Sequence, residues 1–334
     1  VEGPDHVALM EWVCAAKIGG DANIGKGIYT HFLDDAGMVR ADLTVIRMPD
    51  RIRVIDGADA GPRDFHYIRR MAEDKGYNVK VTDVAAEYVT IGIWGPNART
   101  TLQKVVEDPA GLEPAAFPFA AIKQIKIGGK PVTAFRISYV GEQGWELHMK
   151  YSDGLAVWDA LRSTGVMAFG VETYANSRRM EKSLRLQNAD LLTEYNLIES
   201  DLQRPKVKEA DFRGKAANIK HRALPNQVAM LCTLVMNDNK DSKGVARYPV
   251  GILPVMDPET KETLVDDLGR RSFTTSIAYG PTIGKNIALA YLPWSYCQVG
   301  RKVIVEYFGD QYEMEVAGVG YKPLYDPESL KPKT

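Results

Sequence analysis

The chain has 334 residues, 45% hydrophobic and 25% charged, which is typical of a folded globular protein with roughly two to three domains. Its 42 Lys and Arg residues balance 43 Asp and Glu residues, which argues against nucleic acid or an anionic membrane as a partner. The 3 cysteines are far apart and form no Cys-x-x-Cys motif, so neither a disulfide framework nor a zinc site is expected. Because no apolar run reaches the length of a membrane span and no signal peptide is recognisable, we expect a cytoplasmic enzyme.

The chain begins at Val1 with what looks like the end of a strand, and we therefore expect it to start partway through a larger protein. Asp5 is a suitable N-cap for a first helix with apolar residues at helical spacing. Strands rich in β-branched and aromatic residues follow between turn residues, at 27–33, 43–48 and 52–55. Pro62 suits the first turn of a second helix, Gly76 ends it, and a further strand is expected at 79–81.

The same order of elements then repeats about 92 residues later along the chain. Gly95-Pro96-Asn97 precedes a helix in the way that Gly3-Pro4-Asp5 precedes the first one. The later elements follow in the same order, with strands at 121–127, 131–140 and 145–149 and a helix around 155–161. Helices that alternate with antiparallel strands, twice over, predict two split β-α-β units of the ferredoxin-like type.

The rest of the chain changes from this repeat to a pattern of short strands. A long helix is expected at 173–186, and a short helix follows Phe212-Arg213-Gly214-Lys215. Short strand-like runs between turn residues then predict an antiparallel β domain, at 228–235, 272–278, 287–290, 303–307 and 312–316. The tail from Lys322 is expected to be extended. We therefore predict an α+β protein with domains at 1–88, 89–224 and 225–334.

Common catalytic motifs find no support in this sequence. The segment 20–27 is close to the phosphate-binding loop motif. However, Gly27 replaces the Ser or Thr that would hold Mg²⁺, and the segment follows a helix rather than a strand. The 5 histidines are scattered without metal-ligand spacing, so no metal site is expected. No Gly-x-Ser-x-Gly elbow of a hydrolase is present.

A few charged residues allow both an ordinary and a functional interpretation. Asp42 begins a strand, where a carboxylate is disfavoured and needs either a turn or a ligand to explain it. Glu146 lies in an apolar strand, where a solvent-facing alternate position would also explain it. Basic residues on the helix expected at 173–186, Arg179 among them, would ordinarily form a solvated face. The residues alone leave these alternatives open.

Several segments together resemble the glycine-cleavage T-protein (aminomethyltransferase) superfamily, most closely the folate domain at the C-terminus of dimethylglycine and sarcosine dehydrogenases. The match covers nearly the whole chain, and the most specific piece is Tyr-Val-Gly-Glu-x-Gly-Trp-Glu-Leu at 139–147. The other pieces lie at 27–30, 42–45, 117–119, 136–138, 212–215, 275–276 and 299–305. The resemblance implies a cloverleaf of three subdomains around a funnel, with two ferredoxin-like units and a C-terminal β-barrel.

The resemblance also implies roles for particular residues. Asp42 matches the catalytic aspartate of the family, and Tyr29 matches a folate-contacting tyrosine. Tyr139 and Glu146 match the tyrosine and glutamate of the pterin site, whose carboxylate accepts paired N–H donors. The implied cofactor-binding set is completed by Arg179 and Gly57. Gly57 stands where the T-protein has an asparagine, as in the dehydrogenase branch, and Gln187 stands at the Trp of the family's Trp-Gly-x-Asp-Leu segment.

The function that this implies is a tetrahydrofolate-dependent one-carbon transferase that captures formaldehyde or an iminium from N-demethylation and yields 5,10-methylenetetrahydrofolate. One alternative is a demethylase that transfers a methyl group to N5 and yields 5-methyltetrahydrofolate. Another is a folate-binding module without catalysis. No flavin-binding motif is visible, so we expect oxidation of the small methylated substrate to occur in a fused or associated amine-oxidising domain.

Overall fold

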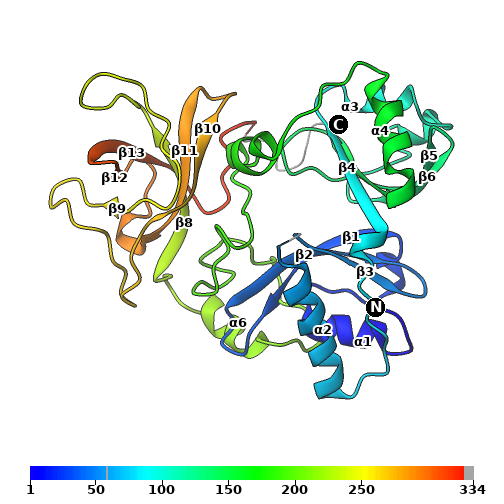
Figure 1. Cartoon of the computed structure of the whole chain (residues 1–334). Helices are drawn as coiled ribbons and strands as arrows, with labels where there is room; N and C mark the ends of the chain where they lie inside the picture. The colour runs from blue at the N-terminus through cyan, green and yellow to red at the C-terminus, as the bar shows by residue number, and fades with distance from the viewer. Residues whose placement is uncertain (58, 327–334) are drawn as a thin grey trace.

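The computed structural model describes residues 1–57 and 59–326, which form three lobes. Figure 1 shows the first lobe in blue, the second in cyan and green, and the third in yellow to red. The part of the tail from 327 onward, which we expected to be extended, lies outside the described residues. The first two lobes each combine a sheet with helices, and the third is built from strands.

The first lobe is a three-stranded antiparallel sheet in the order β1-β2-β3, with its helices packed on one face. Its elements are α1 (His6–Val13), β1 (Lys26–Leu33), β2 (Val39–Arg47), β3 (Ile52–Ile55) and α2 (Gly61–Lys75). The core contains Leu9 and Val13 of α1, Phe32 of β1 and Ile68 of α2. Alternation along β1 therefore turns Tyr29 and His31 away from this core.

The second lobe is a four-stranded antiparallel sheet in the order β4-β7-β6-β5. Its elements are β4 (Tyr88–Trp94), α3 (Ala98–Gln103), β5 (Ile122–Ile127), β6 (Lys130–Phe135), β7 (Gly144–Lys150) and α4 (Gly154–Arg162). The backbone of Val1 exchanges hydrogen bonds of 2.9 Å with Ile52 of β3, as β4 pairs with β7 in the second sheet. The order of pairing supports the internal repeat. Strand β4 was not anticipated from the sequence.

Two expected elements differ from the structure. The strand expected at 79–81 is reduced to an isolated bridge between Lys80 and Glu2. The helix expected at 173–186 is shorter and wider, with a π-helical segment η5 (Glu172–Arg178) and a single turn α5 (Arg179–Glu181). The helix stops because Ser183 takes a positive φ of 55° and the following charged side chains turn inward. The expectation of a solvated basic face is wrong, since Arg179, Lys182 and Arg185 are buried.

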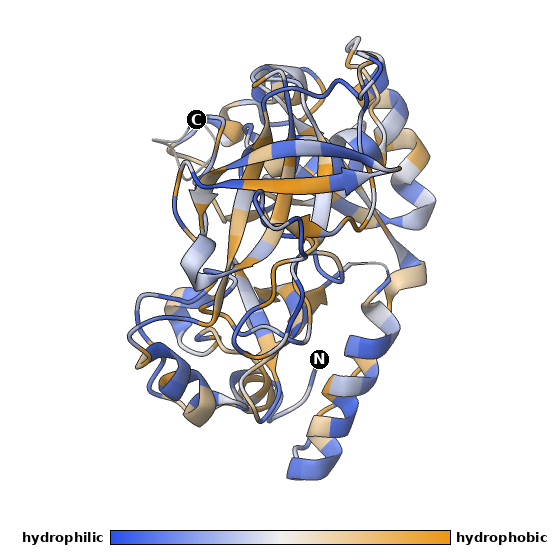
Figure 2. Cartoon of the chain, turned by 90° about the vertical axis from the view of Figure 1, so that its left-hand side faces the viewer, coloured by the Kyte–Doolittle hydropathy of each residue, from blue (hydrophilic) through white to orange (hydrophobic). Residues whose placement is uncertain are grey.

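The third lobe is a curled six-stranded antiparallel sheet in the order β10-β11-β8-β13-β12-β9. Its strands are β8 (Ala229–Met236), β9 (Val255–Met256), β10 (Thr274–Gly280), β11 (Lys285–Pro293), β12 (Lys302–Tyr307) and β13 (Asp310–Val319). Its two edges meet, because Val255 N–H donates to Ser272 O and Thr274 N–H donates to Leu253 O. Helix α6 (Lys215–Arg222) precedes this barrel, whose strands are largely hydrophobic between hydrophilic turns (Figure 2).

Short 3-10 turns complete the chain, at η1 (Asp21–Asn23), η2 (Ala85–Glu87), η3 (Ala110–Leu112), η4 (Tyr151–Asp153) and η6 (Trp294–Tyr296). The sheets of the first two lobes meet edge to edge, where Gly27 N–H of β1 donates to Ala120 O at 3.2 Å. No helix within the described residues is both long and apolar enough to cross a membrane. The boundaries at 88 and 224 remain a prediction.

Candidate functional site

Asp42 and Tyr29 face each other across neighbouring strands of the first lobe. Asp42 lies in β2 opposite His31, two residues from Tyr29 in β1, and all three side chains share the face opposite the core. The Tyr29 hydroxyl donates a hydrogen bond of 2.8 Å to Asp42 Oδ2. The sequence analysis expected both residues at the site, and the sheet register brings them into direct contact.

The surroundings of Asp42 bring the pKa of its carboxyl group closer to neutral pH. Burial raises the pKa of Asp42 to about 6, while the Tyr29 hydrogen bond and the nearby Arg63 limit the rise. Asp56, the first residue of the loop after β3, shows the same behaviour, since burial and the neighbouring Asp64 raise its pKa to about 6. A carboxyl group of this kind can act as either a general acid or a general base.

His31 belongs to the same surface and was not singled out from the sequence. Its ring packs edge-on against Tyr29 with ring centroids 4.8 Å apart. Burial, helped by the charge of Arg204, lowers the pKa of His31 to about 3, so the imidazole is neutral. Its Nε2 atom has no hydrogen-bond partner among the described residues. A scattered histidine carries no sequence signal for such a position, which only the pairing of β1 with β2 creates.

Tyr139 approaches this pair from the second lobe. Its hydroxyl donates a 2.5 Å hydrogen bond to Arg185 O, which ties the loop before β7 to the segment after α5. Burial is the main cause that raises the pKa of Tyr139, and the carboxylates of Asp190 and Asp42 add to it. Tyr139 is therefore near Asp42, as the sequence analysis expected for a shared site.

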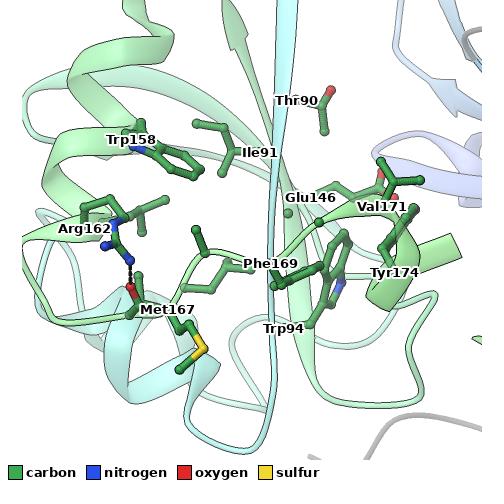
Figure 3. Close-up of a pocket in the computed structure, with 16 residues that line it drawn as sticks. Thr90, Ile91, Trp94, Glu146, Trp158, Arg162, Met167, Phe169, Val171 and Tyr174 are labelled. Carbon is green, nitrogen blue, oxygen red and sulfur yellow. Dashed lines mark hydrogen bonds between the residues drawn. The ribbon is translucent and has the colours of Figure 1, made fainter. Parts of the chain in front are cut away.

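Glu146 lies at one end of a pocket of ≈ 440 Å³ that wraps around the edge strand β4. Figure 3 shows Trp158, Arg162 and Met167 on one side of this strand and Glu146 with Tyr174 on the other. Glu146 is opposite Gly92 of β4, and the space above this glycine is filled by the indole of Trp94. The Glu146 carboxylate, with His148 Nε2 3.4 Å away, thus borders an aromatic surface.

Tyr174, in the π-helical segment, joins the two parts of the site. Its ring stacks on Trp94 with centroids 5.0 Å apart and lies 5.3 Å from the ring of Tyr139. Burial, together with the nearby Glu146 carboxylate, raises the pKa of Tyr174. A continuous aromatic wall therefore runs from the Glu146 pocket toward Tyr139 and Asp42. The sequence analysis missed Tyr174, because the expected regular helix gave it no special position.

Arg179 has its polar contacts within the protein. It is 1% exposed, forms an ion pair with the fully buried Asp190, and donates 2.8 Å and 2.5 Å hydrogen bonds to Leu184 O and Ser276 Oγ. Ser276 belongs to the barrel, so Arg179 links the segment after η5 to the third lobe. No contact joins Arg179 to Asp42 or Tyr29 among the described hydrogen bonds and ion pairs, and its expected place in the cofactor-binding set remains a prediction.

Gly57 lies in the exposed loop between β3 and α2, close to Asp59. Asn188 donates a 2.8 Å hydrogen bond to Asp59 Oδ2, which brings this loop to the segment that follows α5. Gly57 therefore borders the polar surroundings of Asp42. Among residues 1–57 and 59–326, no three His, Cys, Asp or Glu side chains are grouped so that they could hold a metal ion.

The fold is thus a cloverleaf of two related α/β lobes and a β-barrel, with carboxylates and aromatic rings gathered where the first two lobes meet. Residues 1–207 match the GCVT N-terminal domain, and residues 247–326 match the glycine cleavage T-protein C-terminal barrel domain. The chain belongs to the glycine-cleavage T-protein family. This confirms the family that the sequence motifs resemble.

Known relatives agree with this assignment. The chain is 32% identical to the mitochondrial dimethylglycine dehydrogenase of Homo sapiens over 322 residues, which cover 93% of this chain and 34% of the relative. It is 28% identical to the aminomethyltransferase of Listeria welshimeri over 311 residues, which cover 91% of this chain and 78% of the relative. The chain spans about a third of the length of the dimethylglycine dehydrogenases that it matches.

The crystal structure of the glycine cleavage system aminomethyltransferase T from Bartonella henselae superimposes with a TM-score of 0.77. The alignment covers 99% of this chain and 83% of that chain at 21% identity, so it concerns the fold. It confirms the expected α+β class with a C-terminal barrel. The family and its named relatives also confirm the expectation of an enzyme of the aminomethyltransferase type.

Proposed function

We propose that the chain is a tetrahydrofolate-dependent one-carbon transferase that captures formaldehyde or an iminium released by N-demethylation, with 5,10-methylenetetrahydrofolate as the product. The observation that carries the proposal is the half-buried Asp42 carboxyl, whose pKa is raised to about 6 and which accepts a hydrogen bond from Tyr29. A carboxyl of this proton affinity suits both proton transfer and the stabilisation of a cationic one-carbon donor.

The aromatic wall and Glu146 fit a pterin ring. Trp94 and Tyr174 offer flat faces for a planar heterocycle, and the Glu146 carboxylate can accept paired N–H donors at its edge. Tyr139 borders the same wall nearer to Asp42. These residues would hold tetrahydrofolate, which supplies two nucleophilic nitrogens, N5 and N10, when it is bound.

The roles of the protein groups follow from their contacts. The Tyr29 hydroxyl keeps one Asp42 oxygen directed along the sheet face, so that the carboxylate is oriented before a ligand arrives. Asp42 holds or releases a proton at its carboxylate oxygens near neutral pH, and its charge attracts an iminium. Enclosure between the lobes limits the loss of a reactive one-carbon unit to water.

The source of the one-carbon unit lies outside these residues in this proposal. One relative is named a dehydrogenase, and this chain spans about a third of its length. We therefore propose that a fused or associated amine-oxidising domain generates the formaldehyde or iminium from a small methylated substrate. Gly57, close to Asp59 and to the Asp42 surroundings, would border the side from which this donor arrives.

The test compares the wild-type chain with Asp42→Asn in transfer from ¹³C-formaldehyde or methylated amines to tetrahydrofolate, with the uncatalysed rate subtracted and the folate product identified by mass. We expect methylenetetrahydrofolate to form faster than in the uncatalysed reaction, and Asp42→Asn to lower this rate by about 100-fold or more. A methyl product would instead indicate demethylation onto N5. Folate binding without turnover of any donor would indicate a binding module, and an unchanged rate in Asp42→Asn would remove Asp42 from the reaction.

A further inference from the structure

Asp42 has a second partner, which comes from a distant part of the chain. Two orientations of the Gln187 amide can be compared. With the oxygen toward β2, it gains only a 3.4 Å contact from Asp42 N–H and faces the acceptor oxygens of Asp42. With the amino group toward β2, the orientation that satisfies its hydrogen-bond partners, Gln187 donates hydrogen bonds of 2.8 Å to Asp42 Oδ1 and 2.8 Å to Asp42 O. Tyr29 already donates to Oδ2, so each oxygen of the carboxylate receives one hydrogen bond from a different element. The carboxylate cannot rotate without losing one of them.

The orientation of the Gln187 amide is itself determined by its surroundings. In the same orientation its oxygen accepts a hydrogen bond from Arg63 Nη2, so the amide places its donors against an anion and its acceptor against a cation. Arg63 is held in turn by Asp64, whose side chain is 3% exposed and whose Oδ1 lies 2.9 Å from Arg63 Nε. A chain of contacts therefore runs from Asp64 through Arg63 and Gln187 to Asp42.

We propose that Gln187 is a positioning residue for Asp42, which holds the carboxylate in one orientation and stabilises its charged form. The argument stands on the two contacts to Asp42 and on the Arg63 contact that keeps the amide from turning over. Gln187 is half-buried and follows the segment of buried charges, so it reaches β2 from the loop that packs over the site. The functional meaning rests on the proposed function, because it assumes that Asp42 carries the proton.

The proposal predicts the direction in which the pKa of Asp42 changes when Gln187 is replaced. A hydrogen bond donated to a carboxylate favours its ionised form, so removing the donor makes the group harder to ionise. Gln187→Met keeps nearly the same side-chain volume without a donor or an acceptor. Gln187→Glu keeps an acceptor for Arg63 but places a second carboxyl beside Asp42, which disfavours ionisation further.

The experiment measures the ionisation of Asp42 directly in the chain without folate, by ¹³C NMR of carboxyl-labelled aspartate, with the resonance assigned by Asp42→Asn. We expect a midpoint near pH 6 in the wild type, a rise of about one pH unit in Gln187→Met, and a larger rise in Gln187→Glu. Gln298→Met is the matched control. It makes the same substitution at an exposed glutamine between η6 and β12 of the third lobe, and should leave the midpoint unchanged.

A midpoint in Gln187→Met within 0.2 pH units, by our criterion, of the wild type would overturn the proposal, and so would an equal shift in Gln298→Met. If Gln187→Met does not melt cooperatively, Gln187→Glu decides the question by the same measurement. The acidic limb of kcat/KM for methylene transfer should move with the midpoint while KM for tetrahydrofolate stays within twofold. A shifted midpoint in a chain that shows no folate-dependent turnover would reject the proposed function and leave the contact between Gln187 and Asp42 in place.

Discussion

Asp42 is the residue at which stability and chemistry oppose each other. Its side chain is half-buried beside Tyr29 and Gln187, and the ionised form is disfavoured by burial and by the charge of Asp64. Tyr29 and Arg63 offset only part of this effect. A carboxyl group with such a raised pKa is useful for proton transfer, because it can take up and release a proton near neutral pH. Its ionisation at neutral pH lowers the stability of the folded protein.

The first prediction concerns the stability of Asp42→Asn. The pKa of Asp42 is raised in the folded protein from 3.8 to about 6, so its contribution to stability is fully present below about pH 4 and is lost as the pH rises through 6. Replacing the carboxyl by a neutral amide should therefore stabilise the fold at pH 7.5 by up to about 3 kcal/mol. Thermal unfolding at pH 4 and pH 7.5 measures this, and the gain should disappear at the lower pH. The exposed Asp267→Asn serves as control, and a lower melting temperature of Asp42→Asn at pH 7.5 would contradict the prediction.

The second prediction concerns Glu146 and the binding of folate. Glu146 has the imidazole of His148 as a neighbour 3.4 Å away and otherwise faces the pocket, so a bound pterin would gain paired hydrogen bonds there. Glu146→Gln should weaken tetrahydrofolate binding by about 2 kcal/mol, measured by calorimetry, without lowering the melting temperature of the free chain. Glu142→Gln is the comparison, because Glu142 forms an ion pair with Arg178 at 2.9 Å and should affect binding much less. Equal affinities of the wild type and Glu146→Gln would exclude Glu146 from the pterin site.

At the scale of elements, the edge strand β4 and the π-helical segment η5 form the aromatic side of the site together. The side chain of Trp94 occupies the space over Gly92 and Gly144, and its indole N–H donates a 2.9 Å hydrogen bond to Ile137 O. The extra width of the π-helical turn carries Tyr174 onto this indole. The aromatic wall can therefore form at this point because the two neighbouring strands β4 and β7 both carry a glycine there.

The third prediction follows from this close packing. A Cβ atom on Gly144 would lie 2.1 Å from the backbone oxygen of Ile93, a clash that no side-chain rotation relieves. Gly144→Ala should lower the stability of the chain by roughly 2–4 kcal/mol and disturb the near-ultraviolet signal of the tryptophans. Gly170→Ala is a suitable control, since nothing lies within 4 Å of a Cβ at that position and its φ is not positive. If both variants melt at the same temperature, the described packing of β4 against β7 is incorrect.

At the scale of the whole molecule, a short segment of buried charges connects the barrel with the lobes that form the site. Arg179 pairs with Asp190 and donates to Ser276 of the barrel, and Glu181 accepts a 2.6 Å hydrogen bond from Thr282 N–H. The Arg185 side chain, which is 4% exposed, donates a 3.0 Å hydrogen bond to Ser200 O. Because these charged side chains are hydrogen-bonded inside the protein, they hold the segments that they join in one arrangement.

The fourth prediction tests the role of Arg179. Arg179→Met leaves the fully buried Asp190 without its charged partner and should destabilise the chain by about 3–5 kcal/mol. Chemical denaturation measures the loss, and the exposed Arg69→Met should change stability by less than about 0.5 kcal/mol. A direct role in folate binding would give the opposite pattern, with weaker binding in a variant whose stability is unchanged.

Local patterns in the sequence determined most of the architecture. Strands β1, β3 and β7, helix α2 with its left-handed Gly76 cap, and most of the barrel strands agree with the expectations from periodicity and turn residues. The repeat of elements also predicted the pair of related lobes. These features follow from interactions between residues close in the sequence, which depend little on the rest of the chain.

The site was only partly determined in this way. Motif resemblance indicated Asp42, Tyr29, Tyr139, Glu146 and Arg179, whereas the buried ion pair of Arg179 with Asp190 became visible only in the tertiary structure. The contacts of Gln187, Tyr174 and His31 join segments up to 145 residues apart and leave no local signal. The proton affinity of Asp42 is likewise a property of the assembled lobes, because burial and neighbouring charges exist only after the chain has folded.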